Sequence, residues 1–492
     1  MIPSGPEAVL ARPPAEPAEG HDAILDRAFS RVTGSEPLAG NAVRLLKDAT
    51  QNYPAWLDAI RRAERTIHFE NYIVADDEVG RTFADALIER ARRGVKVRFL
   101  YDWWGSLGKA SRGYWARLRA AGIEVRCFNP PQWSSPVACF RRDHRKVMTV
   151  DGRLAFVSGL CLARPWLGDP QGGVPPWRDT GVELRGPVVA DVDQAFAESW
   201  RLSGGAISPE ERILPEDLPE AGPIRMRVVR GRPGQLSTYR VDQLVAAAAR
   251  HTLWLTDAYF VATTAFVQVL TEAARDGVDV RLLVPGSIDV PGVQTLVRSN
   301  YRPLLEAGIR IFEWNGSMLH AKSAVCDGRW ARIGSTNLNL TSWLTNWELD
   351  ITIEDAGFAR LMEATYLEDL GNATEVVLDE RRRVHPMGEP PRPPHAPHGQ
   401  RHKGSGGRLA AGAIGLGSTA GAAITGSRPL SATESRVIAK IGVVFLMLAC
   451  SIFLFPRAVV FPVAFALAWL GWGLLLRAWR LARGSRGAVS PP

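Results

Sequence analysis

The feature that most constrains the fold of this 492-residue chain is an internal duplication. The segment around Thr66 is matched 186 residues later around Thr252, and the Ala-Gly-Ile triplet centred on Gly122 is matched at the same offset by Gly308. Both copies present their apolar segments in the same order between these anchors. A repeat unit of this length is a whole domain, so the sequence predicts two similar domains in tandem and not an array of short repeats.

Each copy alternates between strand-like and helix-like patterns. Residues 55–63 have the apolar spacing of a helix, whereas residues 65–74 are rich in β-branched and aromatic side chains. A second helical pattern stops at Gly94, and the strand-like VKVRFLYD follows it. This alternation predicts an α/β fold, with one domain at 41–205 and the other at 206–380, packed about a pseudo-twofold axis.

One motif occurs once in each copy with the same internal spacing. HRKVMTVDG runs from His144 to Gly152, and HAKSAVCDG runs from His320 to Gly328. Their offset is 176, so the first half carries about ten extra residues just before its motif. An Asp-Gly pair between two apolar runs is a tight-turn signal, which predicts that each motif lies on a β-hairpin.

The spacing of the basic residues in the motif indicates phosphate chemistry. Residues two apart on a strand share a face, so His144 projects with Lys146, and His320 with Lys322. If the two halves pack together, one site receives two imidazoles and two ammonium groups. The ammonium groups would neutralise the oxygens of a phosphodiester, while one imidazole attacks phosphorus and the other protonates the leaving alkoxide. This chemistry requires neither a metal nor an organic cofactor.

Four carboxylates complete the candidate catalytic set. Asp179 and Glu348 lie 35 and 28 residues downstream of their histidines, each at the entry to a strand, and are candidates for the groups that orient the imidazoles. Asp151 and Asp327 belong to the motif itself, but their odd offset of seven from the histidine places them in the turn. We expect them to hold the end of the hairpin more than to contact the substrate.

The regions outside the two domains differ sharply in composition. Residues 1–40 are predicted to be a disordered, proline-rich leader without the pattern of a cleavable signal, and residues 381–435 a basic linker rich in Pro, Gly and His. The histidines of this linker are irregularly spaced, so a solvated coil is expected in preference to a metal site. They are His385, His395, His398 and His402.

The C-terminal region carries two long apolar runs, at 441–455 and 458–476. Their lengths approach the ~20 residues that span a bilayer, so residues 436–480 are predicted to form a transmembrane helical hairpin. Arginines and lysine flank the pair on both outer sides, which favours a multi-pass protein with its catalytic part in the cytoplasm. The alternative is a buried helical hairpin in a soluble domain.

Net charge and cysteine usage limit the classes of partner and of stabilising cross-link that the chain can have. The formal charge of +8 favours anionic partners, either phospholipid head groups or nucleic acid. The five cysteines are scattered and contain no CxxC pair, so neither a disulfide framework nor a zinc site is predicted.

The duplicated HxKxxxxDG motif, followed by GSTN at Gly334 to Asn337, resembles the phospholipase D superfamily. The stretches FENYIVADDEVGRTFADALIERARRGVKVRFLYDWWGS, AFVSGL and WRDTGVELRGP resemble the bacterial cardiolipin synthases, and the likeness covers roughly residues 40 to 380. It implies two phospholipase D-type domains that transfer a phosphatidyl group through a phosphohistidine. His144 would be the nucleophile and His320 the general acid.

The first copy of the motif departs from the pattern of this family. Cys161 stands where the second copy has Asn337, and Ser158 replaces a usual glycine. A thiol is a weaker donor than an amide, so the first half-site has lost one hydrogen bond to phosphate if the asparagine supplies it. Ser335, in the complete second copy, is predicted to support the site together with Asn337, Cys161, Asp179 and Glu348. The intact His-Lys pairs argue against an inert protein.

The resemblance implies a bacterial inner-membrane enzyme that joins two phosphatidylglycerol molecules into cardiolipin and releases glycerol. The alternatives are a hydrolase that gives phosphatidic acid, a nuclease or other phosphodiesterase, and a non-enzymatic lipid-binding scaffold. The predicted membrane hairpin disfavours the nuclease, because tethering brings an enzyme to lipid and not to nucleic acid. Five tryptophans near the first motif are expected either to line a lipid entrance or to pack in the core: Trp103, Trp104, Trp133, Trp166 and Trp177.

Overall fold

The computed structural model describes residues 19–131, 141–169, 171–289, 293–378 and 384–386, together with isolated positions between 443 and 472. The extra residues before the first motif, at 132–140, lie outside this description, as does Trp133.

The first half follows the predicted alternation of strands and helices. Asp77 caps α3 by accepting the N–H of Gly80 at 3.0 Å, and Arg90 and Arg92 lie in the last turn of that helix, where cations are favourable. The elements are α1 (Glu19–Thr33), β1 (Leu38–Lys47), α2 (Asp48–Arg62), β2 (Thr66–Asn71), α3 (Glu78–Arg92), β3 (Lys96–Asp102), α4 (Trp103–Ser106), α5 (Arg112–Ala120), β4 (Glu124–Phe128), β5 (Val147–Val150), β6 (Leu154–Ser158), α6 (Arg164–Leu167), β7 (Thr180–Arg185) and α7 (Val188–Leu202).

Two short 3₁₀ helices, η2 (Pro209–Glu211) and η3 (Pro215–Asp217), lead into the second half, which repeats the order. Its elements are β8 (Ile224–Gly231), α8 (Ser237–Ala248), β9 (Thr252–Thr256), α9 (Thr264–Arg275), β10 (Asp279–Pro285), α10 (Val293–Ser299), α11 (Tyr301–Glu306), β11 (Arg310–Trp314), β12 (Ser323–Cys326), β13 (Trp330–Gly334), α12 (Leu340–Leu344), β14 (Glu348–Glu354), α13 (Ala356–Leu370), β15 (Ala373–Leu378) and β16 (Val384–Pro386).

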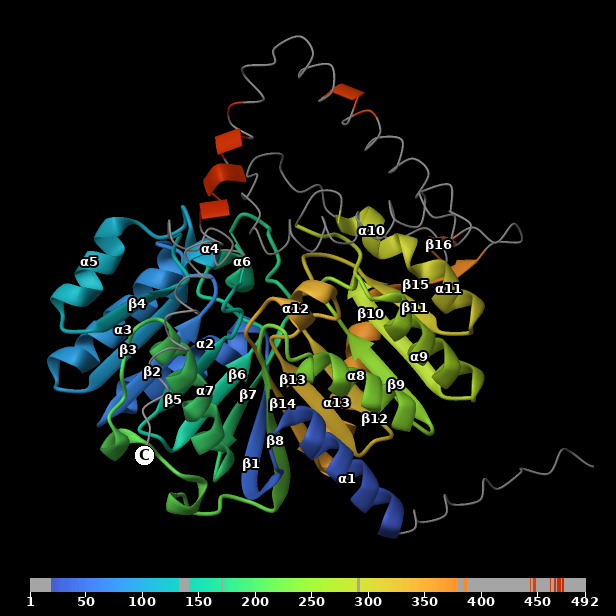
Figure 1. Cartoon of the computed structure of the whole chain (residues 1–492), viewed down its shortest axis with the longest axis horizontal. Coiled ribbons are helices and arrows are strands. Elements are labelled where there is room, and N and C mark those ends of the chain that lie inside the picture. The colour runs from blue at the N-terminus through green and yellow to red at the C-terminus, as the bar shows by residue number, and fades with distance from the viewer. Residues whose placement is uncertain are drawn as a thin grey trace, which may run out of the picture.

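All sixteen of these strands belong to one continuous sheet (Figure 1). The first half runs outward from the centre as β1-β7-β6-β5-β2-β3-β4, and the second as β8-β14-β13-β12-β9-β10-β11, with β15 and β16 added at its edge. The two central strands, β1 and β8, pair antiparallel. A twofold axis through this central pair generates the same strand order in both directions. The duplication seen in the sequence is therefore also a duplication in space.

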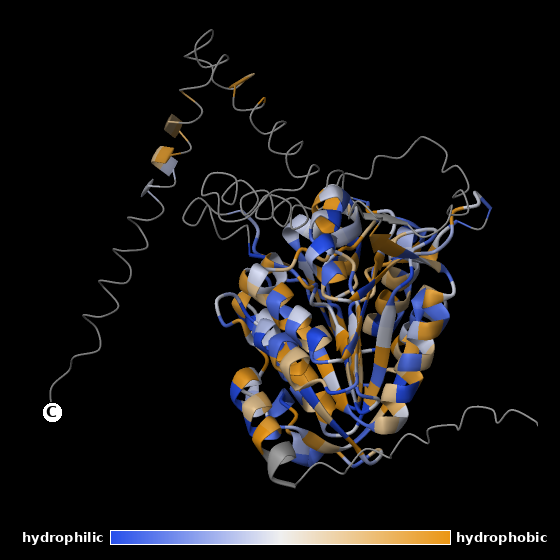
Figure 2. Cartoon of the chain, turned by 90° about the vertical axis from the view of Figure 1, so that its right-hand side faces the viewer, coloured by the Kyte–Doolittle hydropathy of each residue, from blue (hydrophilic) through white to orange (hydrophobic). Residues whose placement is uncertain are grey.

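Helices cover both faces of the sheet, so most strand residues are buried (Figure 2). On one face, α13 packs against strands of its own half and α7 against strands of the first half and β8, and their apolar residues belong to one core that extends across β1 and β8. The helices α2 and α3 bury a core specific to the first half, and α8 and α9 bury one specific to the second. The shared core makes the two halves one packed body at the level of the sheet.

Two predictions for the flanking regions are wrong in part. Residues 19–33 form the helix α1 inside the predicted disordered leader, and the strand β1 begins at residue 38, also inside it. Helix α1 contacts α8, and Phe29 packs against Trp330 with their rings 6.4 Å apart, which explains why this segment is ordered. Within the predicted linker, β16 pairs with β15 because the edge of the sheet offers free backbone groups there.

The other flanking predictions fall mainly on residues that the structure does not describe. These include the rest of the linker, with His395, His398 and His402, and almost all of the predicted hairpin at 436–480. Among the residues that are described, no helix combines the length and apolar character needed to cross a membrane.

Candidate active site

Both motifs lie on β-hairpins, as predicted. The first joins β5 to β6 through Asp151 and Gly152, whose φ angles are 52° and 66°, and the second joins β12 to β13 through Asp327 and Gly328, at 49° and 60°. Two successive residues in the left-handed region define the tight turn that Asp-Gly favours. Each hairpin therefore begins with the histidine of its motif and turns at the aspartate.

The histidines lie where the two halves exchange backbone hydrogen bonds. The His144 N–H donates to the carbonyl of Trp347 at 2.9 Å, and the His320 N–H donates to the carbonyl of Arg178 at 2.7 Å. Trp347 directly precedes β14 of the second half, and Arg178 lies just before β7 of the first. Each histidine is thus fixed to a segment of the opposite half.

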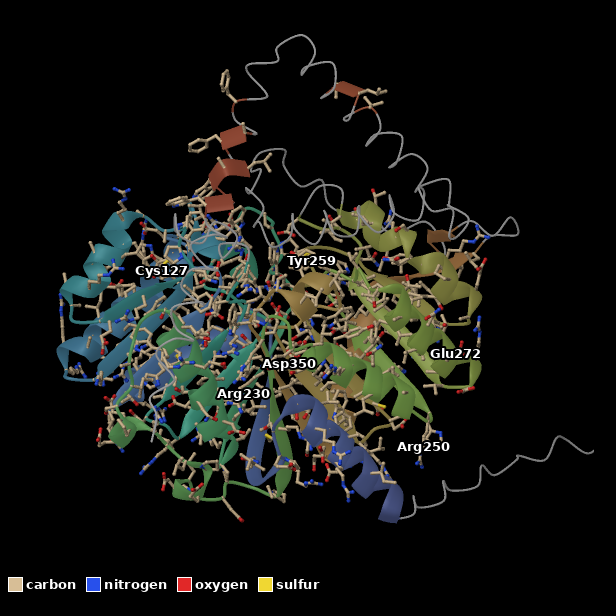
Figure 3. The ribbon with its side chains drawn as sticks, viewed as in Figure 1. Cys127, Arg230, Arg250, Tyr259, Glu272 and Asp350 are labelled. Atoms are coloured by element: carbon tan, nitrogen blue, oxygen red, sulfur yellow. The ribbon has the colours of Figure 1, made fainter. Side chains whose placement is uncertain are left out.

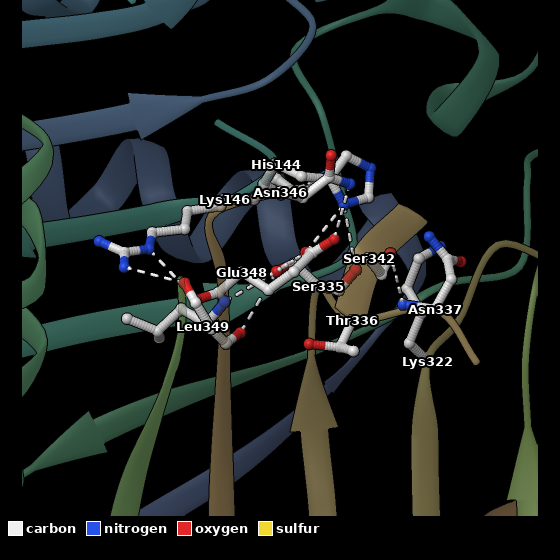
Figure 4. Close-up of polar contacts among 12 residues, drawn as sticks. His144, Lys146, Lys322, Ser335, Thr336, Asn337, Ser342, Asn346, Glu348 and Leu349 are labelled. Atoms are coloured by element: carbon white, nitrogen blue, oxygen red, sulfur yellow. Dashed lines mark hydrogen bonds and ion pairs between the residues drawn. The ribbon is translucent and has the colours of Figure 1, made fainter. Parts of the chain in front are cut away.

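Glu348 holds the imidazole of His144 from the other half (Figure 4). The Nδ1–H of His144 points to Oε2 of Glu348 at 2.9 Å, and the same oxygen accepts the hydroxyl of Ser335 at 2.6 Å. Asn346 donates to the second carboxylate oxygen at 3.1 Å. A proton held on Nδ1 leaves the lone pair of Nε2 available for chemistry.

Asp179 holds the imidazole of His320 in the same way. Its Oδ2 lies 2.7 Å from Nδ1 of His320 and accepts the indole N–H of Trp166 at 2.8 Å, while its Oδ1 accepts the N–H of Thr180 at 2.8 Å. Lys322 Nζ also lies 3.0 Å from this Nδ1, but the anionic Asp179 is closer and fixes the proton there. Trp166 has the role that Ser335 has beside Glu348.

The two orienting carboxylates are those that the sequence singled out, but their pairing is the reverse of the expected one. Each was assigned to the histidine upstream of it in its own half, and each contacts the histidine of the other half. The reason is that the segments before β5 and β12 pair with the segments before β14 and β7 across the pseudo-twofold relation. Neither half completes a histidine-carboxylate pair from its own residues.

The two lysines of the motifs are buried beside the histidines. Each is 1% exposed, and each ammonium group donates to the backbone carbonyl of the histidine two residues before it. Lys146 lies 5.1 Å from the ring centre of Tyr72, and Lys322 lies 5.9 Å from that of Tyr259, which Figure 3 shows near the junction of the two halves. The faces of these rings stabilise the cations where water is scarce.

Burial and the two ammonium charges keep the imidazoles neutral. Burial lowers the pKa of His144 to about 4 although Glu348 opposes the shift, and burial together with Lys322 lowers the pKa of His320 to about 3. Burial also lowers the pKa of Lys322 to about 8, against the effect of Asp179. At neutral pH the empty site therefore contains two neutral imidazoles beside cationic groups, an arrangement ready for an anion.

The carboxylates that orient the imidazoles remain ionised. Burial works to raise the pKa of Glu348, but the interaction with His144 and the charge of Lys146 outweigh it, so the pKa lies below its usual value. Asp179 shows the same balance, with His320 and Lys322 outweighing burial.

Asp151 and Asp327 lie away from this chemistry. The carboxylate of Asp151 accepts the backbone N–H groups of residues 64, 65 and 66, and that of Asp327 accepts those of residues 250, 251 and 252. Each stands at the far end of its strand from the histidine, on the order of 20 Å away at the rise of a strand. Both aspartates were predicted within the candidate catalytic set, and their contacts are those expected of residues that hold the hairpin end.

The departures of the first motif from the second have structural counterparts. Cys161 is fully buried in the first-half core, and its carbonyl accepts the hydroxyl of Tyr53 at 2.6 Å. Burial lowers the pKa of Lys146, and Cys161 opposes this shift. The hydroxyl of Ser158 accepts the N–H of Leu160 at 3.1 Å.

Asn337, the counterpart of Cys161, is also buried beside the site, near Lys322 in Figure 4. Its side-chain Oδ1 has no hydrogen-bond partner among the described residues. The half-site of the second motif therefore offers an amide that the first half-site lacks.

The sequence reading missed three contributors to the site. Tyr72 and Tyr259 lie against the two histidines, with ring centres 4.8 and 6.1 Å from His144 and His320, and Trp166 was named only as a lipid-facing or core residue. The sequence could have indicated the two tyrosines, because each lies just after the same strand of its repeat. Within the described part of the chain, no group of three or more His, Cys, Asp or Glu side chains is arranged to hold a metal ion.

Comparison with known proteins agrees with this site. A family model described as "Cardiolipin synthase, PLD-like domain" matches residues 56–164 and 244–370, so each match contains one of the two motifs. The crystal structure of a phosphatidylserine synthase from Haemophilus influenzae Rd KW20 has a similar fold, with a TM-score of 0.56 at 16% identity over 74% of this chain and 92% of that chain. The fold and the duplicated His-Lys site define a protein of the phospholipase D superfamily.

Sequence relatives narrow the class further. Cardiolipin synthase A of Pseudomonas aeruginosa (strain LESB58) is 35% identical over 364 residues, which is 73% of each chain. Cardiolipin synthase 2 of Bacillus anthracis is 32% identical over 74% of this chain and 72% of its own length. The chain belongs to the cardiolipin synthase family and is an enzyme of the phospholipase D-type phosphatidyltransferase class.

Proposed function

We propose that this protein is a membrane-anchored cardiolipin synthase that joins two phosphatidylglycerol molecules and releases glycerol. The observation that carries the proposal is the site itself: two neutral imidazoles, each oriented by a carboxylate of the opposite half, beside two buried ammonium groups. The phosphodiester of the first lipid would lie between Lys146 and Lys322. The names of the relatives supply the substrate class.

In the first step, Nε2 of His144 attacks phosphorus and forms a P–N bond. The P–O bond to glycerol breaks, and His320 gives its proton to the departing oxygen. Since His320 is neutral in the empty site, it must gain this proton when the substrate binds. The negative charge of the phosphodiester offsets the lysines and raises the pKa of the imidazole. The product of this step is phosphatidyl-His144 and free glycerol.

In the second step, a hydroxyl of another phosphatidylglycerol attacks the same phosphorus. The neutral His320 takes the hydroxyl proton, the P–N bond breaks, and His144 returns with its lone pair. Lys146 and Lys322 stabilise the negative charge that builds on the oxygens in both steps. His144 acts as nucleophile and His320 as acid and base.

The anchoring part of the proposal rests on the sequence. The two apolar runs in 436–480 would form a multi-pass anchor in a bacterial inner membrane, with basic flanks that keep the catalytic domains on the cytoplasmic side. The domains at 41–205 and 206–380 would then face lipid head groups directly, with anionic phospholipid as the partner and no role for nucleic acid.

The test is turnover of labelled phosphatidylglycerol by the purified full chain in mixed micelles. We expect cardiolipin and glycerol in equal amounts, no product from His144→Asn, little product from His320→Asn because both steps use His320, and an acid-labile phosphatidyl-enzyme in the wild type that is absent from His144→Asn. Phosphatidic acid as the sole product would instead identify a hydrolase. Absence of any turnover by the wild-type protein, or cleavage of nucleic acid alone, would overturn the proposal.

A further inference from the structure

Arg142 shares a face of the chain with the two motif residues of the first half-site. Its carbonyl accepts the N–H of Trp347 at 2.8 Å, and the next hydrogen bond joins His144 to the same residue, so this segment is extended. Alternate side chains of an extended segment point the same way. Arg145 points to the other side, where it donates to a carbonyl of α7 at 2.8 Å. Arg142, His144 and Lys146 therefore project together.

Among the residues that the structure describes, no carboxylate lies within 4.0 Å of the guanidinium of Arg142. Its side chain is 2% exposed and lies 4.5 Å from the ring centre of Trp104, and its Nε and Nη1 atoms have no hydrogen-bond partner among the described residues. Every other buried arginine in the described part of the chain has a carboxylate within 4.0 Å: Arg98, Arg145, Arg178, Arg227 and Arg332. A guanidinium always carries its charge, so leaving its donors buried and unpaired costs free energy that an anionic ligand would recover.

Asp102 lies close enough to Arg142 for the guanidinium to lower its pKa, but the hydrogen bonds of this carboxylate go elsewhere. Its two oxygens accept the backbone N–H groups of Gly105 at 2.8 Å and Asp143 at 2.9 Å. Burial raises the pKa of Asp102 to about 7 even though Arg142 opposes the shift. At neutral pH this carboxyl is only partly ionised, so it neutralises Arg142 incompletely.

The position of Arg142 is next to the reacting atoms and not among them. Trp104 and Gly105 belong to α4, and a Cβ on Gly105 would lie 2.1 Å from the carbonyl of Tyr72, so α4 packs directly on that residue. The ring of Tyr72 in turn lies 4.8 Å from that of His144. Two residues along a strand span about 7 Å, which sets Arg142 one side chain beyond the nucleophile.

The second half-site has no such cation. The residue two positions before His320 is Met318, a neutral side chain that is 4% exposed. The near-symmetric site therefore has a lysine beside each histidine but an additional charge on one side only. A symmetric reaction would need no such difference, whereas a reaction with distinct donor and acceptor lipids would.

We propose that Arg142 binds the phosphate of the acceptor lipid. This inference rests on the proposed function, in which the acceptor is a glycerol with its attacking hydroxyl at one end and a phosphodiester at the other. The phosphate of the donor occupies the position between Lys146 and Lys322, so the second anion requires its own donor group. Arg142 favours an acceptor that carries a phosphate over water or a neutral alcohol.

The test compares acceptors with and without a phosphate. Full-length wild type, Arg142→Met and Arg142→Lys are incubated with labelled phosphatidylglycerol in mixed micelles, and cardiolipin, phosphatidic acid and the exchange of labelled free glycerol are measured. Methionine is the residue of the equivalent position in the second half. We expect Arg142→Met to lower cardiolipin formation on the order of 10- to 100-fold through a higher KM for the acceptor, because one charge-assisted hydrogen bond is lost.

Glycerol exchange by Arg142→Met is expected to stay within about twofold of wild type. Arg142→Lys is expected to retain part of the cardiolipin synthesis, because an ammonium group keeps the charge but lacks the paired N–H donors of the guanidinium. Arg126→Met is the matched control, since Arg126 also stacks on a tryptophan, 5.2 Å from the ring of Trp200, but outside the site. It is expected to leave the ratio of cardiolipin to phosphatidic acid unchanged.

Two results would overturn the role of Arg142. One is an equal fall of synthesis and glycerol exchange in Arg142→Met, which is the effect of a structural partner for Asp102. The other is synthesis by Arg142→Met at the wild-type level. If the wild-type protein itself makes no cardiolipin, the proposed function fails, and the assignment of the acceptor site fails with it.

Discussion

Glu348, in the second half of the chain, accepts the Nδ1–H of His144, in the first half, at 2.9 Å. Asp179 and His320 form the reciprocal contact at 2.7 Å. Each candidate catalytic imidazole is therefore oriented by a carboxylate more than 140 residues away, and the site exists only when the two halves pack across β1 and β8.

Replacement of Glu348 by glutamine is expected to affect His144 alone. The amide keeps the shape but removes the charge that fixes the imidazole, so kcat should fall about 10²- to 10⁴-fold with the fold retained. In protein labelled with ¹⁵N-histidine, the Nδ1–H signal of His144 should shift while that of His320 stays. Asp179→Asn is the matched variant and should show the opposite pattern. Shifts of both signals in either variant would contradict the crossed pairing.

Trp166→Phe should identify the tryptophan as a positioning residue. Phenylalanine retains an aromatic ring but lacks the N–H that Asp179 accepts at 2.8 Å, so kcat should fall about tenfold. In an Asp179→Asn background the same change should have little further effect, because the two residues act through one contact. Trp115→Phe, at a tryptophan stacked on Tyr101 away from the site, serves as control for ring loss. Additive effects of the two changes would rule this role out.

Gly159→Ala is expected to be harmful despite its small size. The added Cβ would lie 2.1 Å from Oδ1 of Asp179, so the carboxylate that orients His320 must move. We expect a lower Tm and at least a tenfold lower kcat. Gly113→Ala in the exposed helix α5, where the nearest atom is 3.6 Å away, should instead stabilise the protein by about 0.5–1 kcal/mol. Unchanged kcat in Gly159→Ala would show that Asp179 tolerates displacement.

The alkaline limb of kcat/KM should follow Lys322. Its pKa is lowered by burial to about 8, and the cationic form, present below that pKa, is the one that binds phosphate. Activity should therefore fall as the pH rises through about 8. Lys322→Arg should move this limb to higher pH because the guanidinium keeps its charge, although the maximal rate will be lower. Lys96→Arg, at an exposed lysine paired with Glu211, should not move it.

Asp151→Ala is expected to reduce stability and not chemistry. The carboxylate holds three backbone N–H groups at the end of the hairpin, so its loss should cost about 2 kcal/mol of unfolding free energy. The folded fraction should keep kcat within a few-fold of wild type, and Asp327→Ala should behave alike. A loss of kcat equal to that of His144→Asn at unchanged Tm would return Asp151 to the catalytic residues.

Local patterns in the sequence determined a large part of this protein. The duplication, the order of strands and helices, the two hairpins and the four basic motif residues all follow from spacing along the chain, because side-chain direction on a strand and the geometry of an Asp-Gly turn depend on near neighbours. The candidates Asp179 and Glu348 were also found, since each follows its motif at the start of a strand.

The tertiary structure decided which groups meet. Asp179 and Glu348 each contact the histidine of the opposite half, and Trp166 donates to Asp179 as Ser335 donates to Glu348. Arg142 has no carboxylate partner among the described residues. These arrangements depend on how the two halves pack against each other. Residues 19–33 became a helix for the same reason, because α8 offers a surface that the local composition does not reveal. Pairing across the centre of the sheet joins residues far apart in the chain, and no periodicity within either half encodes such a contact.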